Sequence, residues 1–297
     1  MRYVSVIPRM GGKYELIDKI MPIIMECICV YRLDTYAEIC GGGARLLLAL
    51  LIGTVPYRIY NEVSRGVYSI FKILTEYHLT CEFIGKVEAL GYSREVFEQA
   101  KELINLDEKV YRETGKYMLS DMDAAIYAYV LSIQSRAANM ETYSPSKEWG
   151  NQFVRLSKLL QAHEILKDVE MYNEDCFTLL AELKNKSNVL IYLDPPYIPL
   201  TMQNPKTYGE NSWTLEKHKE LVKELLDTQA KVVLSGYDDG KTYAILEQNG
   251  WTKHFVKEVK LNSSCQKTSK KESIWVNWEI SLCAKANLDI ENDNVSN

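Results

Sequence analysis

Residues 189–197 read VLIYLDPPY, and this stretch decides the fold class. Five apolar residues in a row, closed by Asp194 and two prolines, are typical of a strand buried on both faces of a sheet. Comparable apolar runs that end at turn or polar residues are Tyr36–Ile39, Tyr57–Tyr60, Val169–Tyr172 and Lys231–Leu234. Helical patterns lie between them at Ala44–Leu51, Val63–Tyr77 and Leu215–Asp227. Alternating strands and helices predict an α/β fold with a mostly parallel sheet and helices on both faces.

Two segments depart from this alternation. The stretch 79–163 is rich in helical patterns and contains an irregular polar segment, Ser135–Asn151, so we expect a small helix-rich inserted domain there. Near the carboxyl end we expect an antiparallel hairpin of strands His254–Leu261 and Ile274–Cys283, joined by the polar loop Asn262–Ser273. The expected domains are therefore 1–78 with 164–285, the insertion at 79–163, and a disordered polar tail at 286–297.

The composition narrows the class of protein. The 297 residues are 46% hydrophobic and 25% charged, as in an ordinary globular protein. The net charge of -5 argues against electrostatic binding of a long stretch of nucleic acid unless the basic side chains are concentrated on one face. Seven cysteines without a C-x-x-C pair, and four histidines away from ligand spacing, predict reduced thiols and no zinc site. The apolar stretch Ile20–Tyr31 is too short to span a membrane, so we expect a cytoplasmic protein.

The turn after residues 189–193 carries the strongest chemical signal. The exocyclic amine of adenine is a poor nucleophile, and a methyl transfer to it needs acceptors for the amine hydrogens. The Asp194 carboxylate and the Pro195 carbonyl could each accept a hydrogen bond from one amine hydrogen. Pro195 and Pro196 hold the turn rigid before the base arrives. Tyr197 offers a flat face for a base taken out of its stack. The alternative is a plain proline turn in which Asp194 caps the strand end.

A glycine turn gives the second signal, at Glu38-Ile39-Cys40-Gly41-Gly42-Gly43 between an expected strand and helix. Glycines there let the backbone approach a ligand, and Glu62, after the next expected strand, is spaced to reach ribose hydroxyls. The alternative is a structural turn without a ligand. A dinucleotide fingerprint is disfavoured because Leu46 stands where its third glycine would be. A phosphate-binding P-loop is excluded because no Gly-Lys-Ser/Thr follows.

Two shorter motifs fit a nucleoside cofactor. Arg9-Met10-Gly11-Gly12-Lys13 could bring a cation to a cofactor carboxylate. In Asn173-Glu174-Asp175-Cys176-Phe177, Asp175 could accept from a cofactor's adenine amine while Cys176 or Phe177 packs on the ring. The alternative for Asp175 is a helix N-cap.

Taken in order, these motifs resemble the Dam-type family of DNA adenine methyltransferases, above all its compact bacterial and phage members with R-x-G-G-K, E-x-F-G-G-x-A and L-D-P-P-Y. The similarity runs from Ile7 to about Leu282 and includes Ile59–Glu62, Leu234–Tyr237 and Glu272–Asn277. It implies a Rossmann-type methyltransferase fold, S-adenosylmethionine as the cofactor, and a target-recognition segment inserted before the D-P-P-Y strand.

The resemblance also implies roles for individual residues. Those expected at the cofactor are Arg9, Lys13, Glu38, Cys40, Gly41, Gly42, Gly43, Glu62, Asp175, Cys176 and Asp194. Asp194, Pro195, Pro196 and Tyr197 are expected at the target base. Three residues depart from the family pattern: Cys40 replaces a phenylalanine, Glu62 the commoner aspartate, and Arg9 the aromatic of better-known members. None of these changes removes the acceptors or the stacking ring, so we expect an active enzyme.

Basic and amide side chains are the candidates for DNA contact. We expect Lys267, Lys270 and Lys271, in the polar hairpin loop, to meet phosphates, with a merely solvated loop as the alternative. Pro199–Ser212, which contains Lys206, is expected to be a mobile loop that orders around the flipped base. In the insertion, Gln134, Arg136, Asn139 and Lys147 could read base edges.

The sequence thus predicts S-adenosylmethionine-dependent methylation of the adenine exocyclic amine in double-stranded DNA by base flipping. The alternatives are methylation of adenine in RNA and a DNA-binding relative that has lost catalysis. A monomer or weak dimer is expected, and the resemblance allows a cognate restriction endonuclease as a partner.

Overall fold

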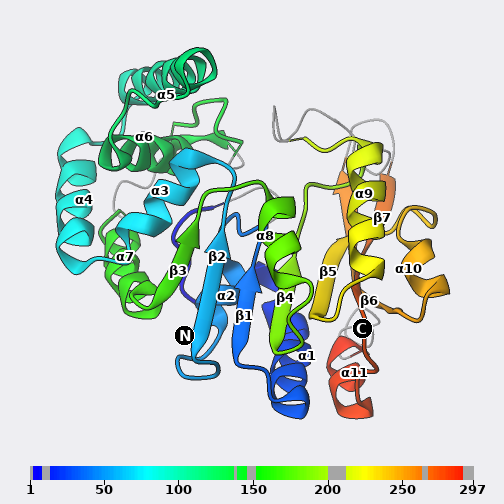
Figure 1. The fold of residues 1–297 in the computed structure, drawn as a ribbon. Helices are drawn as coiled ribbons and strands as arrows, with labels where there is room; N and C mark the ends of the chain where they lie inside the picture. Colours follow the sequence, from blue (N-terminus) through cyan, green and yellow to red (C-terminus); the bar gives the residue numbers. More distant parts are fainter. Residues whose placement is uncertain are drawn as a thin grey trace, which may run out of the picture. The chain divides into compact units, whose positions relative to one another are not determined.

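The structure is a computed structural model, and it describes residues 3–8, 14–136, 139–145, 152–199, 212–262 and 267–289. Its strands form a seven-stranded sheet in the order β3-β2-β1-β4-β5-β7-β6 (Figure 1). The strands are β1 (Thr35–Glu38), β2 (Tyr57–Asn61), β3 (Val169–Tyr172), β4 (Val189–Leu193), β5 (Lys231–Tyr237), β6 (Thr252–Asn262) and β7 (Lys267–Val276). β4 pairs in parallel with β1 and β5, whereas β7 is antiparallel to β5 and β6. The predicted mostly parallel sheet and carboxyl-terminal hairpin are confirmed.

Four of the described helices begin at a residue whose side chain replaces a missing backbone partner. Ser93, Ser120, Asp175 and Thr214 accept a hydrogen bond from an amide in the first turn of α5, α6, α8 and α9. The helices are η1 (Tyr14–Leu16), α1 (Ile17–Tyr31), α2 (Arg45–Ala49), α3 (Arg65–Ile73), α4 (Tyr77–Leu90), α5 (Arg94–Thr114), α6 (Asp121–Gln134), α7 (Gln152–Leu166), α8 (Cys176–Leu183), α9 (Leu215–Leu226), α10 (Ala244–Gln248) and α11 (Leu282–Asp289). None of them, within the described part of the chain, is long and apolar enough to cross a membrane.

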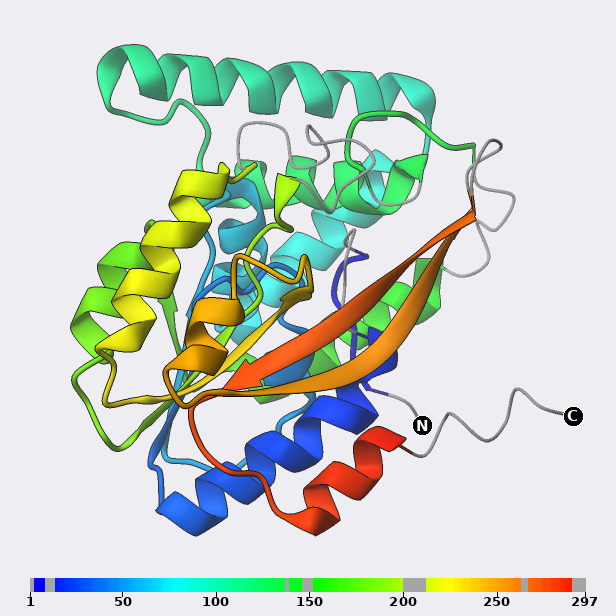
Figure 2. The same cartoon turned by 90° about the vertical axis from the view of Figure 1, so that its right-hand side faces the viewer.

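The chain divides into two compact units. Unit 1 comprises Met1–Gly12, Gly42–Ala49 and Tyr60–Asn173, and unit 2 comprises Lys13–Gly41, Leu50–Ile59 and Glu174–Asn297. Unit 1 contains α3 to α7, and the helices α4 to α7 span most of the segment predicted to be inserted (Figure 1). In unit 2, α11 packs beside α1, where the Ser281 amide donates to Glu26 at 2.9 Å (Figure 2).

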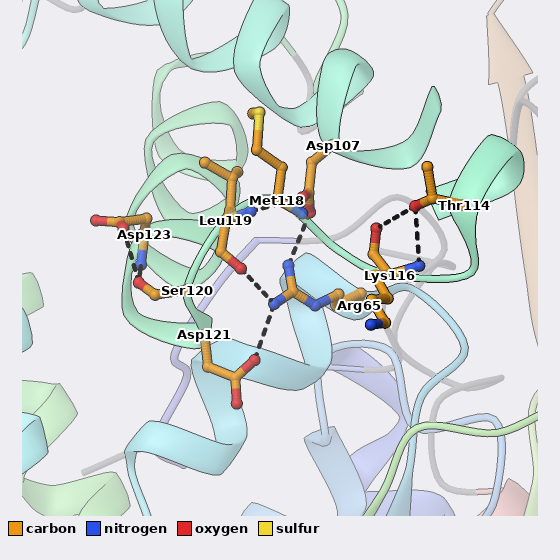
Figure 3. A network of polar contacts seen from close by, with 9 residues as sticks. All are labelled: Arg65, Asp107, Thr114, Lys116, Met118, Leu119, Ser120, Asp121 and Asp123. Atoms are coloured by element: carbon orange, nitrogen blue, oxygen red, sulfur yellow. Dashed lines mark hydrogen bonds and ion pairs between the residues drawn. The ribbon is translucent and has the colours of Figure 1, made fainter. Parts of the chain in front are cut away.

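Within unit 1, a polar network joins α3 to α5 and to the turn before α6 (Figure 3). Asp107 on α5 is only 3% exposed. It accepts from Arg65 at 2.7 Å and from the amides of Met118 and Leu119 at 2.6 and 2.7 Å. The Arg65 guanidinium also lies 4.0 Å from the centre of the Tyr117 ring. A buried carboxylate with this many donors is compensated, so the network stabilises the junction of α3, α5 and the turn before α6.

The chain order of the strands changes direction beside β4. β2 and β3 extend the sheet from one side of β1, whereas β4 and β5 extend it from the other. In open α/β sheets, ligands bind outside the carboxyl ends of the strands at such a switch point. Glu38, the last residue of β1, is in register with Tyr192 of β4, two residues before Asp194. The fold therefore places the D-P-P-Y turn where a ligand site is expected.

The carboxyl-terminal prediction was wrong in detail. β7 begins at Lys267 and ends at Val276, so Lys267, Lys270 and Lys271 lie on a strand rather than in a loop. Residues of the predicted strand end and polar tail form α11 instead. The polar half of β7 carried no apolar alternation, and its pairing with β6 and β5 is set by backbone hydrogen bonds that the sequence pattern does not display (Figure 2).

The helix predictions were too long. α2 spans only Arg45–Ala49, and the predicted helix at 63–77 ends at Ile73, with α4 beginning anew at Tyr77. The pattern of apolar residues continues across the break, which is why the sequence did not reveal it.

Candidate active site

The D-P-P-Y turn leaves the sheet between two buried anchors. Leu193, the last residue of β4, is fully buried, and Ile198 is 1% exposed. Asp194 and Tyr197 between them are half-buried, and Pro195 is buried. Because the two prolines lack an N–H group and have restricted backbone angles, the turn presents the Asp194 side chain and the Tyr197 ring from a rigid support.

Tyr197 packs against residues of the two following strands in the sheet. Its ring stacks on that of Tyr237 with centroids 3.9 Å apart and planes at 20°. Its hydroxyl lies 3.2 Å from Oε2 of Glu272, and the hydroxyl of Ser235 lies 3.3 Å from the other oxygen. Nζ of Lys270 lies 5.5 Å from the centre of the Tyr237 ring. The four side chains form the Tyr197 cluster, defined as Tyr197, Tyr237, Ser235 and Glu272.

A buried imidazole lies near this turn. His218 on α9 is fully buried, and its Nδ1 lies 2.8 Å from the hydroxyl of Tyr243. Burial lowers the pKa of His218 to about 4, so the ring is neutral near pH 7. Burial also raises the pKa of Tyr243, and the nearby Cys40, Asp239 and Asp194 raise it further. The Tyr243 hydroxyl therefore stays protonated and can donate to His218.

The carboxyl end of β1 contributes the first part of the glycine turn to unit 2. Glu38 is 3% exposed, and the amide of Ile39 donates to the Tyr192 carbonyl of β4 at 3.2 Å. Cys40 is half-buried and forms no disulfide, and Gly41 is buried. This edge of unit 2 thus brings a buried carboxylate and a thiol next to the strand that carries Asp194.

The remainder of the glycine turn lies in unit 1 and is held by Glu62. The amides of Gly42 and Ser64 each donate to one oxygen of this carboxylate at 2.8 Å. The Tyr60 hydroxyl donates to the Gly42 carbonyl at 2.8 Å. Gly42 has a φ of +50°, which favours glycine, and a Cβ there would meet no heavy atom within 4 Å. A carboxylate oxygen has more than one acceptor site, so Glu62 retains capacity for ligand hydroxyls.

Asp175 is the N-cap of α8, which was the alternative role predicted for it from the sequence. It accepts from the Phe177 amide at 3.0 Å and forms an ion pair with Lys217 at 2.8 Å. Burial raises its pKa, but the hydrogen bonds from Lys217 and Phe177 outweigh burial and lower the pKa overall. Phe177 stacks on Trp213 at 5.6 Å, and Lys217 lies 4.9 Å from the Trp213 ring. Cys176 is 7% exposed.

A family model for D12 class N6 adenine-specific DNA methyltransferases matches residues 10–274. The chain belongs to this family. No curated protein matches the chain significantly. The resemblance and the enzyme class predicted from the sequence are confirmed: this is an adenine-specific DNA methyltransferase, and its family implies S-adenosylmethionine as the methyl donor.

The residues expected to contact DNA differ in exposure and in hydrogen bonding in this methyltransferase. Arg136 is exposed. The amide oxygen of Asn139 already accepts from the backbone of Glu141 and Thr142 at 2.9 and 3.0 Å. Gln134, suggested as a base reader, is 1% exposed and donates to the Gly91 carbonyl at 3.0 Å, so it stabilises the fold instead. Arg9, Lys13, Lys147 and Lys206 lie outside the described residues.

Several residues around the D-P-P-Y turn were not predicted from the sequence. Glu272 and Tyr237 were noted only as parts of family-like motifs, and His218 and Tyr243 were not singled out. Each is separated from Asp194 by tens of residues, and only strand pairing and helix packing bring them together.

Proposed function

We propose that this enzyme methylates the exocyclic amine of an adenine flipped out of double-stranded DNA, with Asp194, Pro195 and Tyr197 acting on the base. The position of the D-P-P-Y turn, immediately after β4 and beside the β1–β4 switch point, is the observation that carries the proposal. A base inside a duplex stack cannot present its amine to such a turn, so the reaction requires flipping.

Each residue of the turn has a distinct role in this proposal. The Asp194 carboxylate and the Pro195 carbonyl accept hydrogen bonds from the two N–H groups, which directs the nitrogen lone pair away from the ring as the amine pyramidalises. One of these two protons is released to solvent after the methyl group has been transferred. Pro196 keeps both acceptors in place before the base arrives, so little reorganisation is needed. Tyr197 stacks on the base and sets the plane in which its amine lies.

S-adenosylmethionine, when bound, supplies the methyl group. The glycine turn and Glu62 fit its ribose, because Gly42 leaves open space beside the backbone and both Glu62 oxygens are already oriented by amides. Asp175 fits the adenine amine as a third partner beside Lys217 and the Phe177 amide. We assign the other contacts, from Arg9, Lys13, Glu38, Cys40, Gly41, Gly43, Cys176 and Asp194, on the family pattern alone.

DNA contacts complete the proposal. Lys270 lies over Tyr237, next to Tyr197, so it is suited to a phosphate flanking the flipped nucleotide. We propose further phosphate contacts for Lys267, Lys271 and Lys206, and base or backbone contacts for Arg136, Asn139 and Lys147 in the inserted segment 79–163, which would serve as the target-recognition domain. We further propose a cytoplasmic, bacterial or phage-encoded enzyme that is a monomer or weak dimer and acts alone or with a cognate restriction endonuclease.

The decisive experiment follows label from tritiated S-adenosylmethionine into nucleosides. The purified enzyme is incubated with unmethylated duplex DNA of mixed sequence or with single-stranded RNA, and the products are digested and separated. We expect label in N6-methyl-2′-deoxyadenosine from the duplex and none in the nucleosides from RNA. Label from RNA alone would support the RNA alternative, and DNA binding without label would support an inactive relative.

Asp194→Ala tests the assigned chemistry. Loss of one preorganised acceptor should lower kcat by roughly 100- to 1000-fold. Asp227→Ala, which removes an exposed carboxylate at the end of α9, is the matched control and should leave kcat unchanged. An Asp194→Ala enzyme with the wild-type rate would refute the mechanism.

A further inference from the structure

The Tyr197 cluster contains a carboxylate whose burial needs an explanation. Glu272 is 2% exposed although it lies on the lysine-rich strand β7. Its register partner on β5 is Tyr237, so the two side chains share one face of the sheet. Burying a carboxylate is costly unless hydrogen-bond donors compensate it. Leucine could fill a similar space without this cost, which points to a use for an acceptor at this position.

The donors to Glu272 come from the turn after β4 and from β5. The Tyr197 hydroxyl donates to Oε2 at 3.2 Å, and the Ser235 hydroxyl donates to Oε1 at 3.3 Å. Ser235 is itself fully buried on β5. Both hydroxyls donate to carboxylate oxygens, so the tip of the Tyr197 ring is held at one point.

Tyr237 constrains the same ring from its face. At a centroid distance of 3.9 Å and an angle of 20°, the two rings are in contact, and no base fits between them. With its hydroxyl held by Glu272 and one face covered by Tyr237, Tyr197 can meet an incoming base only on the face turned away from Tyr237.

We propose that Glu272 and Tyr237 are positioning residues for Tyr197, and that the flipped adenine completes a three-layer stack of Tyr237, Tyr197 and base. The inference rests on the proposed function, because it assumes that Tyr197 receives the target base. Glu272 sets the tilt of the ring through its hydroxyl, and Tyr237 supports the ring from behind. The position of the adenine amine relative to Asp194 then depends on two residues that never touch the base.

The test compares Glu272→Ala with Glu272→Gln. Glutamine can still accept from Tyr197 through its amide oxygen, so it should retain kcat within a few-fold, whereas alanine should lower kcat by roughly 10- to 100-fold. KM for DNA should change less than kcat, because phosphate contacts remain. Glu220→Ala, which removes an exposed glutamate of α9, is the matched control.

A fluorescence readout separates positioning from general stability. 2-Aminopurine replaces the target adenine in a duplex whose methylated position has first been mapped by sequencing, and its emission reports whether the flipped base is stacked. Stacking on Tyr197 quenches the emission, so Glu272→Ala and Tyr237→Leu should each raise it relative to wild type, while Glu220→Ala should not. Unchanged emission together with unchanged kcat in Glu272→Ala would overturn the proposal.

Tyr197→Phe covers the case in which Glu272→Ala does not fold. It retains the stacking ring but removes the hydroxyl, and it should lower kcat several-fold and raise the emission. Wild-type kcat and emission in Tyr197→Phe would overturn the role of Glu272. If the wild-type enzyme places no label in adenine, the proposed function fails instead, so the two failures are distinguishable.

Discussion

Two stacked tyrosine pairs, one in each unit, are built from similar parts. Tyr111 and Tyr117 stack at 4.0 Å and 8° in unit 1, and Tyr197 and Tyr237 stack at 3.9 Å and 20° in unit 2. A cation lies over each pair, and a nearly fully buried carboxylate lies beside it: Asp107 in unit 1 and Glu272 in unit 2.

The two carboxylates differ in what they hold. Asp107 pairs with the cation itself, Arg65, and with two backbone amides at 2.6 and 2.7 Å, so the charge is neutralised within the network (Figure 3). Glu272 accepts from the hydroxyl of a stacked tyrosine and from a serine at longer distances. The first arrangement joins helices, whereas the second orients a ring. Stability and turnover should therefore respond separately to mutations in the two pairs.

Removing Asp107 should give the largest change in stability. Asp107→Ala leaves the mostly buried Arg65 guanidinium and two amides without their acceptor, so the free energy of unfolding should fall by about 3–5 kcal/mol. Urea denaturation measures this loss. Glu113→Ala on the same helix removes an exposed carboxylate and should cost less than about 0.5 kcal/mol. Equal losses in the two variants would contradict the structural role of the network.

Lowering the pH should reduce the free energy of unfolding through protonation of His218 in unit 2. Its folded pKa of about 4 lies below the ordinary value, so the unfolded chain binds a proton more readily between pH 6.5 and 4. This part of the stability is complete above pH 6.5 and is lost as the pH falls, by about 3 kcal/mol at pH 4. Urea denaturation of His218→Gln should show a shallower decline over this window. A wild-type decline in the variant would place the titration elsewhere, for instance at His254, whose pKa burial also lowers.

Replacing one ring of each pair, Tyr117 in unit 1 and Tyr237 in unit 2, tests whether the two pairs have different roles. Tyr117→Leu removes the stack on Tyr111 and the contact with Arg65, and it should lower the free energy of unfolding by about 1 kcal/mol without changing kcat. In Tyr237→Leu, the loss of kcat, expressed as an activation free energy, should exceed the loss in the free energy of unfolding. Thermal denaturation and the methylation assay on both variants decide the matter, and a kcat loss in Tyr117→Leu would remove the distinction between the pairs.

The cation over the second pair should give the smallest effect. Lys270→Met removes one proposed phosphate contact, so DNA affinity should fall modestly and the slope of log affinity against log salt should decrease by about 1. Titrations of labelled duplex at several salt concentrations measure the slope. Lys219→Met, at an exposed position of α9, is the control. An unchanged slope for Lys270→Met would limit this lysine to its contact with Tyr237.

The parts predicted well from the sequence are those that local patterns encode. β3 and β4 have the predicted bounds, because a short apolar run closed by polar or proline residues marks a buried strand. The helix cap at Asp175 was also among the interpretations considered. Strand β7 was misplaced, because half of it is charged and its partners lie on β5 and β6, far along the chain.

By itself, the sequence determined the α/β fold class, the family, and the placement of Asp194, Pro195, Pro196 and Tyr197 after a buried strand. Those features depend on neighbouring residues: apolar runs favour buried strands, and prolines restrict their own backbone. Only the tertiary structure decided that Tyr197 meets Tyr237 and Glu272, and that Arg65 meets Asp107. Such contacts depend on strand register and helix packing between distant segments, which no local pattern specifies.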